Sequence, residues 1–346
     1  MSKPAKRLNL ALQGGGAHGA FTWGVLDRLL EEEGLEIAGI SGTSAGALNG
    51  AALKAGLLRG GRQAARENLD WLWQQIGAVG DMRLAAWFRA FLPATRLWEE
   101  LTERFVPFSP GETATRLFSP YDYGPFYVNP LERIIKQFRF AEICSPVEPH
   151  FYVAATNVRT GKIKVFSGAE VTEQAILGSA CLPTIFKAVE IPDPATGRTE
   201  HYWDGGYTGN PALFPLFAPS LPQDIVIVSV NPRVREEIPV TAQEILDRIN
   251  EVSFNASLLS EIRAIGFVKR LIREGRTEPG AMKDVLLHFI ADDGLMNSLS
   301  ARSKMLPEPG MLAELKEAGR AAAGRFLADH GHRLNTEDST KPSDIL

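Results

Sequence analysis

A turn near the start of the chain contains residues that could carry out acyl transfer. Ser44 lies between Gly42 and Gly46 in the pattern G-x-S-x-G, where an apolar segment meets a run of small residues. In a nucleophile elbow, glycines on both sides relieve crowding in a strained backbone and leave the serine hydroxyl exposed. The N-terminus of the following helix favours the alkoxide that develops during attack. A helix N-cap is the alternative role for a serine here, but the paired glycines favour a nucleophile.

A glycine-rich loop, Gly14-Gly15-Gly16-Ala17-His18-Gly19, precedes this turn. Its pattern fits a pyrophosphate site or an oxyanion hole, because both use backbone N–H groups at the start of a helix. A dinucleotide-binding protein should place an acidic residue at the end of its second strand, about 20 residues after the glycines. Here that strand ends in Ile40-Ser41-Gly42, so an oxyanion hole is favoured. A tight turn that binds nothing is the remaining alternative.

A serine nucleophile needs a proton acceptor, and two arrangements are available. The first is a dyad with Asp204, which ends a predicted strand and is followed by Gly205 and Gly206. The unperturbed pKa of an aspartate is about 3.9, so an apolar environment would have to raise it. The second is a Ser-His-Asp triad with His288 or His330. His288 lies in the apolar run VLLHFI and His330 follows a helix, so the dyad is favoured. For the aspartate itself, a plain Asp-Gly hairpin turn is the alternative.

The elements that must position these residues alternate between strand and helix. Apolar runs at 8–12 and 35–40 predict strands, and each leads through a glycine turn into a helix, at 20–32 and 44–55. This order implies parallel strands joined by crossovers. The run IVIVSV at 225–230 is typical of a strand that is buried on both faces. The sequence therefore predicts an α/β fold.

Composition argues against several classes of protein. The 346 residues carry a formal net charge of -4, which gives no basic face for nucleic acid. Two cysteines, Cys144 and Cys181, are too few for a disulfide framework. The N-terminus lacks the pattern of a secretory signal, and no run of about 18 apolar residues predicts a transmembrane helix. A cytoplasmic protein is expected, with peripheral contact to a membrane as a further expectation.

Taken in order, the three motifs resemble those of patatin-like phospholipases. Asn210-Pro211 and Ser179-Ala180-Cys181-Leu182-Pro183 are similar to further blocks of that family. The resemblance covers about residues 8–232. It implies a three-layer α/β/α fold with a mainly parallel central sheet, and lipid acyl hydrolysis without a metal or cofactor. It also implies a catalytic dyad of Ser44, the nucleophile, and Asp204, the proton acceptor.

The glycine loop is where the chain departs from the family pattern. The resemblance implies an oxyanion hole formed by the backbone of Gly14, Gly15 and Gly16, with Gly19 completing the motif. Many members carry Arg or Lys where this chain has His18, and that cation supports the oxyanion loop or a phosphate head group. His18 is therefore expected to contact the substrate or the loop, and it weakens the case for a phospholipid head group.

The expected domain organisation follows the resemblance. Residues 1–7 form an N-terminal segment and 8–232 the patatin-like catalytic domain. Residues 57–125 form a helical, aromatic-rich insertion, interpreted as either a helical subdomain with core aromatics or a hydrophobic lid over an apolar substrate. A C-terminal helical extension, 233–333, packs on the same domain, as in a bacterial subgroup of the family. The polar tail, 334–346, is expected to be disordered.

These features predict a serine lipid acyl hydrolase of the phospholipase A or lysophospholipase type, acting on a lipid or acyl-ester substrate. One alternative is an esterase with a Ser-His-Asp triad, or a hydrolase of another acyl ester such as a polymer ester or thioester. Another is a non-catalytic regulatory module at a membrane surface. The aromatic region 84–127 is the segment expected to contact a membrane. No metal, cofactor or nucleic acid is expected.

Overall fold

The computed structural model describes residues 5–79, 119–122, 127–278, 280–299, 301–304 and 307–345. The strands in this part of the chain are β1 (Lys6–Leu12), β2 (Leu35–Thr43), β3 (His150–Asn157), β4 (Ile163–Ser167), β5 (Val189–Asp193), β6 (Arg198–Asp204), β7 (Asp224–Val228) and β8 (Leu286–Ile290). They form one sheet in the order β5-β6-β3-β2-β1-β7-β8, with β4 paired to β3. Strands β3, β2, β1, β7 and β8 are parallel, whereas β4, β5 and β6 pair antiparallel. The predicted mainly parallel sheet is therefore confirmed.

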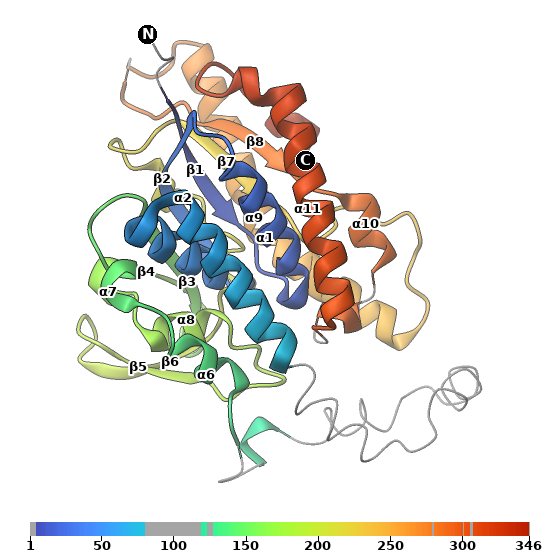
Figure 1. Ribbon diagram of the computed structural model, residues 1–346. Helices are drawn as coiled ribbons and strands as arrows, with labels where there is room; N and C mark the ends of the chain where they lie inside the picture. The colour runs from blue at the N-terminus through green and yellow to red at the C-terminus, as the bar shows by residue number, and fades with distance from the viewer. Residues whose placement is uncertain are drawn as a thin grey trace.

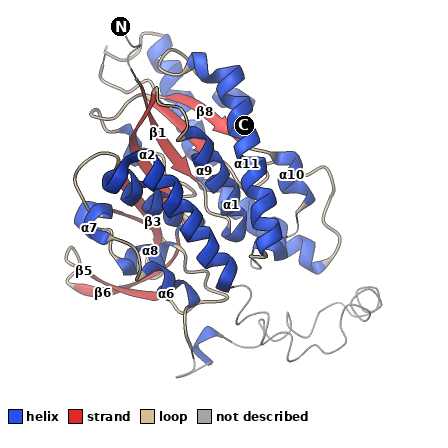
Figure 2. Cartoon of the chain, viewed as in Figure 1, coloured by secondary structure: helices blue, strands red, loops and turns tan. Residues whose placement is uncertain are grey.

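Helices cover both faces of this sheet (Figures 1 and 2). Those described are α1 (Gly19–Leu29), α2 (Ala45–Val79), α6 (Pro130–Ile135), α7 (Phe140–Ile143), α8 (Glu173–Ser179), α9 (Ala242–Arg273), α10 (Asp293–Ser298) and α11 (Pro309–His330). Successive side chains of a strand point to opposite faces. Leu10 and Leu12 of β1 accordingly join the core beneath α1, α2 and α11, whereas Ala11 joins the core beneath α9. The expected three-layer α/β/α architecture is therefore confirmed.

Helices α1 and α11 pack closely through two glycines. A Cβ atom at Gly24 would lie 1.8 Å from the backbone oxygen of Lys316, and one at Gly319 would lie 2.0 Å from that of Phe21. No side chain fits in either place, so the two helix backbones can approach only because both residues are glycine. This crossing joins the C-terminal extension to the first helix of the chain.

The first part of the predicted insertion, 57–125, belongs to the main core. Helix α2 continues to residue 79 through a kink at Gly60 and Gly61, and Leu69 and Trp73 beyond that kink are buried with the side chains of α1. The lid interpretation, and most of the aromatic region expected to contact a membrane, fall outside the described residues. None of the described helices has a stretch long and apolar enough to cross a membrane.

The C-terminal tail lies against the sheet as far as residue 345, whereas its polar composition predicted disorder over 334–346. Polar residues of the tail hydrogen-bond to the edge strand β8 and to its neighbour β7: Asn335 with Asp224, Asp338 with the backbone of Leu287, and Ser339 with His288. The tail thereby supplies partners for strand groups that an open sheet edge would expose. The tail has no large apolar face, which is why its composition predicts disorder. Hydrogen bonds to the strands hold it instead.

Candidate active site

Strand β3 brings the ends of β2 and β6 together. Ala154 pairs with Thr43 of β2 on one side and with β4 on the other. The next residue, Ala155, pairs with β4 and with Asp204 of β6. Since a strand has only two sides, β2 and β6 must lie end to end along the side of β3 opposite β4. Ser44, which follows the end of β2, therefore meets Asp204 at the end of β6.

Ser44 occupies the tight turn between β2 and α2. Its φ angle is +55°, in the left-handed region that residues other than glycine rarely adopt. Such strain persists where the surroundings fix it, often at functional sites. A Cβ atom at Gly42 would lie 2.6 Å from the backbone oxygen of Gly46, and one at Gly46 would lie 2.1 Å from that of Leu12. The N–H of Ser44 donates to the Ser179 hydroxyl at 3.0 Å, which also holds the turn.

Asp204 is completely buried beside this turn. Its Oδ1 accepts a hydrogen bond from the Gly206 N–H at 2.8 Å. Its Oδ2 has no partner of full hydrogen-bond geometry among the described residues, although the Ser44 hydroxyl lies within range of the carboxylate. Burial raises the pKa of Asp204 from 3.8 to about 7, and the Gly206 N–H and Ser44 hydroxyl only partly oppose this change. A carboxylate with a pKa near neutrality can both accept and return a proton.

The glycine loop lies against the serine turn. A Cβ atom at Gly14 would lie 2.6 Å from the Cβ of Ser44. The Gly14 N–H donates to Oδ1 of Asn210 at 2.6 Å, whereas no described residue accepts a hydrogen bond from the N–H of Gly15 or Gly16. Two of the three predicted oxyanion donors are thus free of partners in the described part of the protein, as an anion site requires. The other motif glycines are also closely packed: Gly19 on Ala45, Gly205 on Ala154 and Gly206 on Phe254.

Polar side chains that the sequence analysis missed hold this loop. Oε1 of Gln13 accepts hydrogen bonds from the N–H groups of Val230 and Asn231, at 2.9 and 3.0 Å. Nδ2 of Asn231 donates to the backbone oxygen of Gly14 at 2.7 Å. Both side chains are buried, and buried polar groups need such partners. The available signal was a polar residue directly after an apolar strand, at Gln13 and at Asn231.

His18 contacts the C-terminal part of the chain. Its Nε2 lies 2.6 Å from the Ser303 hydroxyl, and its ring is buried. Burial, and then the nearby charge of Lys304, lowers the pKa of His18 to about 3. The imidazole is therefore neutral near pH 7 and provides no positive charge. The expected contact of His18 with the substrate or the loop stays a prediction.

The alternative Ser-His-Asp triad does not form. Nε2 of His288 lies 3.0 Å from Oδ1 of Asp224, the first residue of β7. Ser44 follows the opposite, C-terminal end of a strand in the same parallel part of the sheet. His330 ends α11. The backbone oxygen of the next residue, Gly331, accepts a hydrogen bond from Nζ of Lys6 at the start of β1. Both histidines therefore lie toward the N-terminal ends of the parallel strands, whereas Ser44 lies beyond their C-terminal ends.

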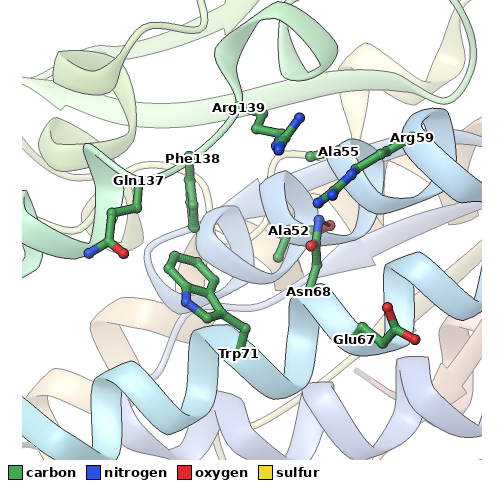
Figure 3. A pocket seen from close by; sticks show the side chains of 9 residues that line it. All are labelled: Ala52, Ala55, Arg59, Glu67, Asn68, Trp71, Gln137, Phe138 and Arg139. Carbon is green, nitrogen blue, oxygen red and sulfur yellow. Dashed lines mark hydrogen bonds between the residues drawn. The ribbon is translucent and has the colours of Figure 1, made fainter.

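The surface hollow drawn in Figure 3 is separate from Ser44 and Asp204. It has a volume of about 350 Å³ and lies between the two halves of α2 and the segment that follows α6. Trp71 and Phe138 lie on one side of it, and Arg59 and Arg139 lie on the other (Figure 3). No group of three or more His, Cys, Asp or Glu side chains in the described ranges could hold a metal ion.

The fold and the turn define the class of protein: a three-layer α/β/α protein with a serine in a strained elbow beside a glycine-rich loop. The family model of patatin-like phospholipases matches residues 10–217, more than half of the chain. The chain therefore belongs to the patatin-like phospholipase family, which confirms the resemblance seen in its motifs. Membership implies lipid acyl hydrolase activity in general terms.

Among solved structures, the crystal structure of VipD from Legionella pneumophila is similar, with a TM-score of 0.43 and 13% sequence identity. The similarity covers 95% of this chain and 68% of that chain. It is too distant to add to the family assignment. No curated protein matches the sequence.

Proposed function

We propose that this protein hydrolyses carboxylic esters of lipids with a catalytic dyad, in which Ser44 is the nucleophile and Asp204 is the base. One observation carries the proposal: a strained serine adjoins a fully buried carboxylate whose pKa is about 7. An exposed aspartate would be a weak base, but the burial that raises its pKa brings the group close to the operating pH. His18 is a weaker base than Asp204, because its pKa is lowered to about 3, and His288 is held by Asp224.

The reaction proceeds in two stages. Oγ of Ser44 attacks the ester carbonyl carbon while its proton passes to Asp204. The oxyanion accepts hydrogen bonds from the N–H groups of Gly15 and Gly16. When the C–O bond breaks, the leaving alcohol takes the proton from Asp204. Asp204 then accepts a proton from the water that attacks the acyl-enzyme, and it returns this proton to Ser44 as the fatty acid leaves.

Gly14 has a different role from the one that the family resemblance implied. Its N–H is held by Asn210, so we assign it to fixing the loop rather than to binding the oxyanion. Its lack of a side chain remains essential, since any Cβ atom would collide with Ser44.

Hydrolysis of a p-nitrophenyl acyl ester by Ser44→Ala tests the nucleophile. We expect kcat to fall by more than about 10³-fold, as for the loss of other serine nucleophiles. Ser41→Ala is the matched control, because Ser41 is a buried serine of β2, just before the turn, whose hydroxyl donates to the backbone of Ala212. A fluorophosphonate should label Ser44 in the wild type and in the control. Undiminished hydrolysis by Ser44→Ala would refute the proposal.

The lipid ester that is cleaved can be identified in the same series. A total lipid extract incubated with the wild type should lose one class of ester and gain free fatty acid, relative to the extract incubated with Ser44→Ala. A folded wild type that neither hydrolyses esters nor reacts with the fluorophosphonate would instead favour a regulatory module.

A further inference from the structure

A largely buried hydrogen-bond chain runs from Lys304 to the glycine loop. Nζ of Lys304 donates to Oδ1 of Asn231 at 2.9 Å, and Nδ2 of Asn231 donates to the backbone oxygen of Gly14 at 2.7 Å. The orientation of the amide is forced, because an ammonium group can only donate and a carbonyl oxygen can only accept. Each link therefore polarises the next in the same direction.

The chain ends on the peptide bond that carries the Gly15 N–H. The carbonyl of Gly14 and the N–H of Gly15 belong to one planar, resonance-coupled unit. A hydrogen bond donated to the carbonyl fixes this plane and strengthens the N–H as a donor. Asn210 holds the same peptide from a second direction, since its Nδ2 lies 3.3 Å from the Gly14 oxygen. The Gly15 N–H itself has no acceptor among the described residues.

Lys304 places a cation next to the loop. Its side chain is only 18% exposed, and a carboxylate oxygen of Glu251 lies 4.0 Å away. Glu251 is held more closely by Arg235, at 2.6 Å, and by Arg248, at 3.3 Å. Burial lowers the pKa of Lys304, and the charge of Glu251 opposes this change. Because Glu251 already has two closer partners, ion pairing with Glu251 alone does not explain why a lysine is buried at this position.

We propose that Lys304 is a positioning residue for ester hydrolysis: through Asn231 it orients and polarises the Gly15 N–H that binds the oxyanion. The proposal rests on the function proposed above. It gives a role in the active site to a residue outside the family match at 10–217. Backbone packing supports it, because the oxygen of Lys304 lies 2.2 Å from where a Cβ atom of Gly16 would be.

Steady-state kinetics on a p-nitrophenyl acyl ester test this relay with Lys304→Met and Asn231→Leu, which break it at different links. Losing an oxyanion donor outright costs about 10²–10³-fold in kcat, so a donor that is retained but poorly oriented should cost about tenfold. KM should stay within about twofold, since the contact acts in the transition state. The double variant should be no slower than the slower single one, because both changes interrupt one chain.

Arg248→Gln is the matched control, because it also removes a cation from Glu251 but leaves Asn231 untouched. Its kcat should stay within about twofold of wild type, and thermal unfolding shows whether each variant is folded. Wild-type kcat in Lys304→Met, an equal loss in the control, or additive losses in the double variant would each overturn the relay. If Lys304→Met does not fold, Asn231→Leu and the control decide the question.

Ser44→Ala separates this proposal from the one on which it rests. Hydrolysis that survives in Ser44→Ala overturns the proposed function, and the role of Lys304 with it. An inactive Ser44→Ala beside a fully active Lys304→Met overturns the relay alone.

Discussion

Replacing Asp204 with asparagine should abolish hydrolysis and, at the same time, stabilise the fold. The amide is nearly the same shape, and its oxygen can still accept the Gly206 N–H that Oδ1 accepts now. It cannot take a proton from Ser44, so kcat should fall by at least about 10³-fold. It also carries no charge, so the free-energy cost of burying an ionised carboxylate at this completely buried position is removed.

The size of the stabilisation follows from the pKa of Asp204. Folding raises that pKa from 3.8 to about 7, so the native protein binds the proton more tightly than the unfolded chain. The free energy of unfolding of the wild type must therefore fall as the pH rises from about 4 to about 7. The raised pKa costs roughly 4 kcal/mol of stability at pH 8 and roughly 2 kcal/mol at pH 5. For a chain of this length, 4 kcal/mol corresponds to about 5 °C in Tm.

Thermal unfolding of the wild type and Asp204→Asn, measured at pH 5 and pH 8, checks this expectation. The gain in Tm should be clearly larger at pH 8. Ser44→Ala is the control, since it is also inactive but keeps the buried carboxylate. The pH profile of wild-type kcat/KM should rise through about pH 7, because only the ionised carboxylate can accept a proton. A gain in Tm that is equal at both pH values, or a loss of Tm at pH 8, would refute the reasoning.

Two further substitutions probe the frame around the site. Gly46→Ala should lower the free energy of unfolding by at least about 3 kcal/mol, because the new methyl group would lie 2.1 Å from the backbone oxygen of Leu12. Gly34→Ala, which has open space around it, is the control in the same denaturant titration, and an equal loss there would contradict the steric argument. His288→Ala should lower stability by about 3 kcal/mol, since it leaves Asp224 buried without its ring partner. It should leave kcat within about twofold, and a folded but inactive variant would revive the Ser-His-Asp triad.

The turns of the candidate site were predictable because their requirements are local. A serine with φ of +55° needs neighbours without side chains, so Gly42 and Gly46 must flank Ser44 at fixed spacing. The glycine loop was predictable for the same reason, since its glycines follow one another at fixed spacing in the sequence. The alternation of strand and helix along the chain then predicted parallel pairing.

The partners of those turns were not predictable because they come from distant parts of the chain. Asn231 reaches the Gly14 carbonyl only after β7 has paired with β1. Lys304 reaches Asn231 only after the segment before α11 has folded back over the loop. The same holds for the tail, whose polar residues find hydrogen bonds only on a sheet edge that the sequence does not display. The sequence places His288 in an apolar run, but only the structure identifies its partner, Asp224.

By itself, the sequence determined the α/β class, the strained serine turn and the glycine loop, because backbone sterics require glycine at particular positions. It also singled out Asp204 as the residue opposite the serine. The tertiary structure alone decided that β2 and β6 lie end to end along β3, which brings Ser44 and Asp204 together. Burial, which is a property of the assembled fold, then raised the pKa of Asp204 to about 7 and left His18 uncharged.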